Sequence, residues 1–141
     1  MSVEQAALAV LDAVNDRDLD RIHDFVTDEF VDHGSPFPLP PGPDGYIAVL
    51  RFVTEVLQIR YEVADTLVAG DRIAIRGLAH GVASAQVHGP DAAGRPYTME
   101  TIHIYRADGD RLAEHWGVRD ELGVLFQLGV MAPPDASLVA L

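Results

Sequence analysis

The chain contains no cysteine, which excludes disulfide bonds, thiolate nucleophiles and zinc sites built on cysteine. Basic residues are also scarce, because 10 Lys and Arg stand against 22 Asp and Glu, for a net charge of −12. Such a field repels phosphate backbones and anionic lipid surfaces. We therefore expect neither nucleic acid nor a membrane surface as a partner.

Other signals are missing as well. No apolar run approaches the ~20 residues that cross a bilayer, and Met1–Gln5 does not have the basic start of a signal peptide. We therefore expect a cytoplasmic protein. The six histidines show neither HxH nor HExxH spacing, and the glycines form no phosphate-binding pattern. We expect no metal and no cofactor.

The length and composition fit one globular domain. The chain has 141 residues, of which 48% are hydrophobic and 23% are charged, so it can form a core and does not have the composition of a disordered chain. We expect a single domain over residues 1–141. Pro133-Pro134 falls within its last part, residues 131–141, which we expect to form a C-terminal tail.

Helical patterns come first along the chain. Ser2 and Gln5 form a capping-box pattern before an apolar stripe at helical spacing. Two further helices are expected, over 18–26 and from Asp44, where Tyr46 belongs to the inward face; a proline-rich loop covers 34–44. Alternating strand patterns follow. This order predicts an α+β fold with helices on one face of a curved antiparallel sheet.

The last two strands are predicted to form a hairpin around residues 107–110. If Arg106 faces Arg111, then His103 opposes Glu114 and Thr101 opposes Trp116, because paired strands are antiparallel. One face of this hairpin then carries the following side chains: Met99, Thr101, His103, Tyr105, Glu114, Trp116, Val118 and Asp120. The opposite face carries His115, and a slip of one residue would break this grouping.

This face has the composition of a binding pocket, because a few polar groups converge within apolar surroundings. Asp120 precedes the apolar stretch 122–125, where burial would raise the pKa of its carboxyl group and suit it to proton transfer. Alternatives remain for each residue. Asp120 can cap the following turn, His103 can be a hydrogen-bonded core histidine or a cross-strand partner of Glu114, and Trp116 can belong to the core.

A series of short motifs runs along the chain. They are Pro41-Gly42-Pro43-Asp44-Gly45, Ala69-Gly70-Asp71-Arg72, Gly94-Arg95-Pro96, Ile104-Tyr105-Arg106, Glu114-His115-Trp116 and the stretch from Asp120 to Gly129. Together they resemble the SnoaL-like polyketide cyclases, or ester cyclases, of the NTF2-like superfamily. The resemblance runs from Val3 to Val130. It implies an NTF2-like α+β cone in which N-terminal helices and a strongly curved sheet enclose a pocket.

The resemblance also implies a function. In the cyclases a pocket aspartate near the end of the last strand acts as acid and base in an intramolecular aldol closure, without metal or cofactor, and Asp120 matches it. His103 is the second candidate catalytic residue. The candidate substrate-binding residues are His33 at the pocket mouth, Tyr46, Glu100, Tyr105, Glu114 and Trp116. The expected ligand is a small hydrophobic or polyketide-like molecule.

Other functions on the same fold stay open. An epoxide hydrolase would need a second carboxylate near Asp120, from Glu100 or Glu114. An isomerase-like enzyme or a non-catalytic binding domain would keep the pocket. The resemblance also implies a homodimer formed through the sheet, and Ile73, Ile75, Ile102 and Ile104 are expected to supply apolar surface for it.

Overall fold

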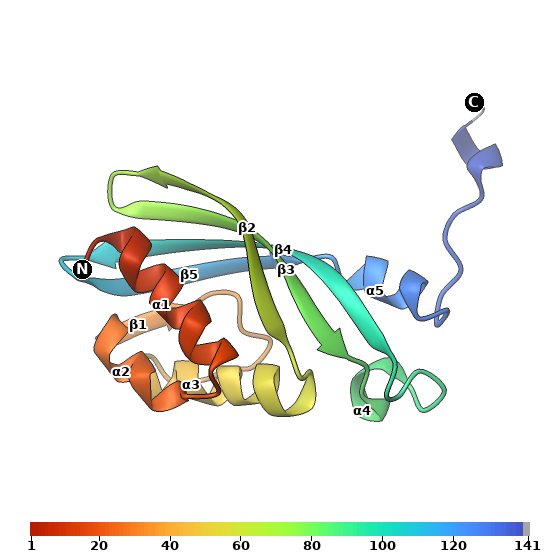
Figure 1. The fold of residues 1–141 in the computed structure, drawn as a ribbon, viewed down its shortest axis with the longest axis horizontal. Coiled ribbons are helices and arrows are strands. Elements are labelled where there is room, and N and C mark those ends of the chain that lie inside the picture. The colour runs from red at the N-terminus through yellow and green to blue at the C-terminus, as the bar shows by residue number, and fades with distance from the viewer. Residues whose placement is uncertain (140–141) are drawn as a thin grey trace.

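Three N-terminal helices cover one face of a curved sheet in the computed structural model, which describes residues 1–139 (Figure 1). Helix α1 spans Val3–Asn15, and Ser2 and Gln5 form the predicted capping box at its start. Its inward stripe, which includes Val10 and Val14, is fully buried. The helix therefore packs on the sheet through the face that its sequence predicts.

The remaining helices are short. A 3₁₀ turn at Leu19–Arg21 leads into α2 (Ile22–Phe25), and α3 (Pro43–Arg51) continues as a π-helical turn, Phe52–Val56. The other helices are α4 (Ala85–His88), α5 (Glu121–Gln127) and a final 3₁₀ turn, Ala136–Val139. No helix within the described residues is long and apolar enough to cross a membrane.

The five strands lie in the order β1-β5-β4-β3-β2. They span Val26–Asp32 (β1), Arg60–Ala69 (β2), Arg72–Val82 (β3), Pro96–Asp108 (β4) and Arg111–Arg119 (β5). Strands β2 to β5 pair antiparallel, as predicted, whereas β1 joins the edge of β5 in parallel. The sheet is therefore mixed, and the segment before the proline-rich loop is part of it.

The register of the β4–β5 hairpin differs from the prediction. Asp108 pairs with Arg111 around a two-residue turn, and a bulge beyond Ala107 shifts the later pairs so that Tyr105 faces His115 and Ile104 faces Trp116. The tighter turn alone would keep the predicted faces, since it moves the register by two residues. The bulge adds one residue and turns the β5 side chains over.

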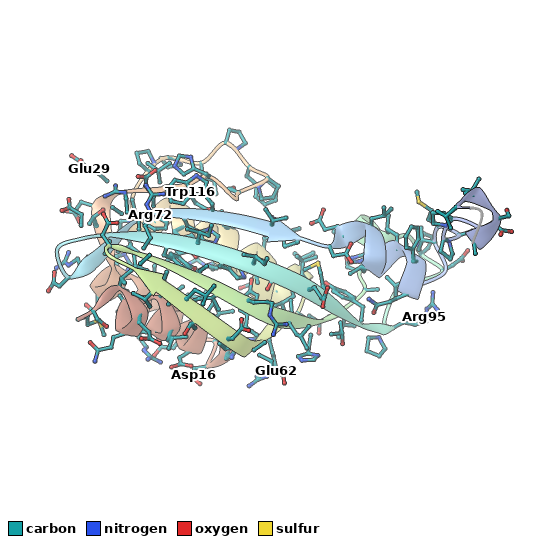
Figure 2. All side chains as sticks on the ribbon, turned by 90° about the horizontal axis from the view of Figure 1, so that it is seen from above. Asp16, Glu29, Glu62, Arg72, Arg95 and Trp116 are labelled. Carbon is teal, nitrogen blue, oxygen red and sulfur yellow. The ribbon has the colours of Figure 1, made fainter. Side chains whose placement is uncertain are left out.

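The two faces of the sheet consequently carry different sets of side chains. His103, Tyr105 and His115 point toward the helices and are buried. Glu114 and Trp116 share the opposite, outer face with Ile102 and Ile104, and in Figure 2 the Trp116 side chain lies beside Arg72. Ile73 and Ile75, expected on the outer face, are instead buried in the core.

The residues after α5 lead away from the sheet, as Figure 1 shows. The side chains of Leu138 and Val139 are 75% and 64% exposed. Of the C-terminal tail expected over 131–141, residues 140 and 141 lie outside the described part of the chain.

Candidate active site

A line of three buried side chains connects β1 to β4 beneath the helices. Asp32 Oδ1 lies 2.7 Å from His115 Nδ1, and His115 Nε2 lies 2.9 Å from His103 Nδ1. The pairing of Asp32 with His115 in neighbouring parallel strands puts the carboxylate beside the ring. We call Asp32, His115 and His103 the relay.

The end of the relay is an unpaired nitrogen. His103 Nε2 is buried and has no hydrogen-bond partner among the described residues. If Asp32 accepts from Nδ1–H of a neutral His115, then His115 Nε2 must accept from Nδ1–H of His103. That tautomer leaves a lone pair on His103 Nε2, which is the arrangement of a general base.

Within the relay, the neutral form of His103 and the ionised form of Asp32 are favoured. Burial, helped by the nearby charges of His115 and Arg119, lowers the pKa of His103 to about 3. Burial alone would raise the pKa of Asp32, but the hydrogen bonds from His115 and the Gly34 amide, with the charges of His115 and Arg119, hold it below its ordinary value. Asp32 is therefore held in its ionised form, whereas burial favours the neutral form of His103.

Gly117 makes room for the two imidazoles. It lies opposite His103 in the hairpin, and a Cβ atom there would come within 3.1 Å of His115 Cε1 and 3.8 Å of His103 Nδ1. A side chain at position 117 would therefore crowd the His115 ring, which would have to shift by a few tenths of an ångström. Glycine at this position leaves room for the two rings side by side.

Two tyrosines extend the polar group. The hydroxyls of Tyr46, from α3, and Tyr105, from β4, are 2.6 Å apart in the core. Burial raises the pKa of each tyrosine above its ordinary value, so both are neutral at ordinary pH. One hydroxyl donates to the other, which leaves one O–H of the pair free to donate to another acceptor.

These groups line a small inner cavity. Its volume is about 20 Å³, and His103, His115, Asp32, Tyr105 and Arg119 are among its lining residues. That volume accommodates about one water molecule. The inner cavity can therefore hold about one non-hydrogen atom of a ligand, such as a carbonyl oxygen.

A larger pocket adjoins the inner cavity. It has a volume of about 190 Å³, lies beneath the proline-rich loop and is lined mostly by apolar residues such as Phe30, Phe37 and Leu39. The two spaces share Asp32, Tyr46 and Val49 as a wall. Because a cavity of about 150 Å³ holds benzene, the larger pocket suits a molecule of one or two rings.

The predicted catalytic aspartate lies elsewhere. Asp120 is exposed and forms the N-cap of α5, where its Oδ1 accepts a hydrogen bond of 2.9 Å from the Gly123 amide. The expectation that Asp120 is buried in an apolar pocket is therefore wrong. The alternative from the sequence, that it caps the following turn, describes its position.

The other predicted site residues divide between the two faces. His103, Tyr105 and Tyr46 meet in the inner cavity. The remaining four lie outside it: His33, Glu100, Glu114 and Trp116. Glu114 bonds His33 Nε2 at 2.8 Å and Arg106 Nε at 2.7 Å, while His33 stacks on Trp116 with ring centroids 5.0 Å apart. We call His33, Arg106 and Glu114 the outer cluster.

The sequence reasoning missed Asp32, His115 and Arg119 as pocket residues. His115 was expected on the opposite side, and the bulge places it inward. Asp32 comes from a strand that pairs in parallel with a partner 83 residues away. No local sequence pattern predicts such a pairing. Within residues 1–139, no three His, Asp or Glu side chains are grouped so that they could hold a metal ion.

The fold and site define a class of α+β protein in which a polar acid–base group lies beneath helices in an apolar interior. The sequence profile of the SnoaL-like polyketide cyclases matches residues 4–128. The chain belongs to this family, which supports a cyclase-type enzyme acting on a small molecule. No curated protein matches the chain.

Solved structures agree with the family assignment. IdmH, a proposed polyketide cyclase from Streptomyces antibioticus, is 26% identical, with a TM-score of 0.78 over 92% of this chain and 99% of its own. A SnoaL-like polyketide cyclase from Agrobacterium tumefaciens is 23% identical, with a TM-score of 0.78 and the same two coverages. AclR from Streptomyces galilaeus, a proposed hydroxylase, is 16% identical and covers 98% of this chain and 91% of its own at a TM-score of 0.78. The last two likenesses concern the fold alone, and the fold does not choose the reaction.

Proposed function

We propose that the protein is a cofactor-independent cyclase or lyase that moves a proton at the carbon next to a carbonyl group. His103 Nε2 removes the proton, His115 takes over the charge, and Asp32 stabilises the imidazolium. The observation that carries this proposal is the unpaired Nε2 of a buried histidine at the end of a hydrogen-bonded line. An aspartate still serves in acid–base work, but it is Asp32 and not Asp120.

The adjoining pocket supports a substrate class for this chemistry. A largely apolar space of about 190 Å³ beneath the proline-rich loop suits the body of a one- or two-ring carbonyl compound. The carbonyl oxygen would reach past Tyr46 into the inner cavity, with the α carbon at the boundary between the two spaces. A folded polyketide intermediate of that size, or a ring ketone, has this composition.

A second observation bears on the epoxide hydrolase alternative. That reaction would need two carboxylates near one another in the pocket. Glu100 is exposed, Glu114 belongs to the outer cluster, and Asp120 caps α5. The described residues offer Asp32 as the carboxylate of the inner cavity, so we favour proton transfer at carbon over water addition to an epoxide.

The proposal is tested without knowledge of the substrate. One- and two-ring ketones and β-keto esters are incubated with the protein in deuterated water, and the loss of α-proton signals is followed by NMR. We expect exchange faster than in buffer for some members, and its loss in His103→Gln. Buffer rates for every compound, or full exchange by the His103→Gln variant, would contradict the proposal.

We also propose a homodimer that forms through the outer face of the sheet. Leu67, Ala74, Ile104 and Trp116 follow one another across four strands. Leu67 and Val118 are 75% and 73% exposed, and a broad apolar surface of this kind is typical of an interface. A second copy supplies the same surface, as a twofold contact requires. Light scattering that gives the 15.3 kDa monomer mass would contradict it.

A further inference from the structure

Arg119 combines a position in the inner cavity with unused hydrogen-bond donors. It follows His115 and Gly117 on the inward face of β5 and lines the inner cavity with His103. Within the described residues its one hydrogen bond runs from Nη2 to the Gly34 carbonyl, at 3.0 Å. A guanidinium group has five N–H donors, so most of its donors are free for a ligand.

The acidic partner of Arg119 is a weak one. Glu121 Oε1 lies 3.7 Å from Arg119 Nε, and the Glu121 side chain is 75% exposed, against 21% for Arg119. Exposed contacts of this kind contribute little. The buried carboxylate of the cavity, Asp32, interacts with this charge, since Arg119 helps to lower its pKa. Its Oδ1 accepts hydrogen bonds from His115 and Gly34, and no hydrogen bond or ion pair joins it to Arg119 among the described residues.

The proposed reaction creates a negative charge that the Arg119 cation can compensate. When the C–H bond breaks, the proton goes to His103 Nε2, the bonding pair forms a C=C bond, and the carbonyl π pair moves to the oxygen. His103 passes its Nδ1 proton to His115 Nε2, and charge in the relay then balances, because the imidazolium of His115 lies against the carboxylate of Asp32. The negative oxygen of the enolate is left to be compensated by another group.

We propose that Arg119 binds this oxygen, so that the substrate is a carbonyl compound held as its enolate between His103 and Arg119. The inference rests on the proposed function for the proton transfer, and on the lining of the cavity for the anion site. Hydrogen bonds from a charged donor to an oxyanion are short and strong, and they act most where water is excluded. The rest of the molecule disfavours anions, because its net charge is −12.

The test compares an enolate with a neutral ketone of the same ring size. Cyclohexane-1,3-dione is largely an enolate anion in neutral buffer, whereas cyclohexanone is uncharged. Binding of each is measured by NMR titration on the natural protein, on Arg119→Met and on Arg76→Met. Arg76 pairs with Asp65 on the exposed surface, so its variant makes the same change in net charge away from the cavity.

We expect the natural protein and Arg76→Met to bind the dione at least about tenfold more tightly than cyclohexanone. Arg119→Met should lose this preference and keep its affinity for cyclohexanone. Arg119→Lys retains the charge and should recover part of the preference. It provides a second test of the anion site if the methionine variant does not fold.

Two results would overturn the inference. One is the absence of any preference for the dione in the natural protein. The other is an equal loss of both ligands in Arg119→Met and Arg119→Lys, since that is the signature of a residue that only holds the loop through Gly34. A dione preference that depends on Arg119, without α-proton exchange in cyclohexanone or any other ketone, would support the anion site and overturn the proposed function.

Discussion

The relay and the outer cluster use the same kinds of residue on opposite faces of one hairpin. Each joins a histidine to a carboxylate over a short distance, 2.7 Å for His115 and Asp32 and 2.8 Å for His33 and Glu114. The side chains of the first pair are 6% and 9% exposed, whereas those of the second are 41% and 26% exposed. The two pairs differ in their access to water, and for this reason we expect the buried pair to be the one that takes part in proton transfer.

Burial changes how favourable a charged group is in the relay compared with the outer cluster. In the relay, the pKa of His103 falls to about 3 because burial disfavours its charge. In the outer cluster, the hydrogen bonds from His33 and Arg106 lower the pKa of Glu114, and water is free to solvate any charge that forms. A buried relay with an unpaired end is suited to proton transfer, and a solvated cluster is suited to surface contacts.

The largest effect on the α-proton exchange rate is expected at His103, and the same measurement on Asp120 distinguishes the two candidate catalytic residues. His103→Gln removes the proposed base, and general acid–base catalysis typically contributes about 10²- to 10⁴-fold. We expect the α-proton exchange rate to fall by that factor. Asp120→Asn should leave it nearly unchanged, because Asn caps a helix as well as Asp does. A large loss of rate in Asp120→Asn, with a nearly unchanged rate in His103→Gln, would instead assign the catalytic role to Asp120.

Asp32→Asn tests whether the three relay residues act as a unit. An amide can hold His115 in the wrong tautomer and cannot balance an imidazolium, so we expect a loss of about 10²-fold or more in exchange rate. The double variant with His103→Gln should be no slower than His103→Gln alone. A further, multiplicative loss in the double variant would mean that Asp32 acts independently of the relay.

The pH dependence of the free energy of unfolding gives a second test of the buried relay. Because the folded pKa of His103 is about 3, the unfolded chain binds this proton more readily than the native state at any pH between about 6.5 and 3. Stability is therefore lost as pH falls through this window. Denaturant unfolding should show that the natural protein loses roughly 2 kcal/mol more than His103→Gln between pH 7 and pH 5.

Equal losses in the two proteins would show that His103 is protonated in the native state at pH 5. Asp32 does not alter the expected sign, because its lowered folded pKa affects stability only at more acidic pH, around and below its unfolded value.

The smallest effect is expected at the outer cluster. Glu114→Gln keeps the shape of the side chain and weakens two partly exposed contacts, to His33 and Arg106. Such contacts contribute little to stability, and none of the three residues lines the inner cavity. Exchange rates should stay within about twofold, far below the loss of about 10²-fold or more expected when acid–base catalysis is removed. A loss comparable with that of Asp32→Asn would erase the distinction between the two faces.

Much of the fold could be predicted because local physics specifies it. The capping box at Ser2 and the apolar stripe of α1 are encoded within a few residues, and so is the alternation of β3 and β4. Family motifs along the chain pointed to the same architecture. His103, Tyr105 and Tyr46 were predicted for the pocket and do line the inner cavity, since each lies on the inward face of its own element.

Two of the errors come from dependence on a distant partner or on one inserted residue. A bulge at the Arg106–Ala107 step of the β4–β5 pairing reversed the faces of β5, so that Glu114 and Trp116 lie outward and His115 inward. The parallel pairing of β1 with β5 brought Asp32 to His115. Asp120 was misplaced because a capping aspartate and a pocket aspartate look alike when they precede an apolar helix.

The sequence by itself determined the acidic, cysteine-free character, the helices-then-strands order and the identity of the polar residues available for chemistry. The tertiary structure alone decided which of them meet. Composition and periodicity act over a few residues, whereas a relay requires side chains from β1, β4 and β5 to lie within hydrogen-bond distance of one another. Only the strand register supplies that distance, and a register that shifts by one residue exchanges the buried face for the exposed one.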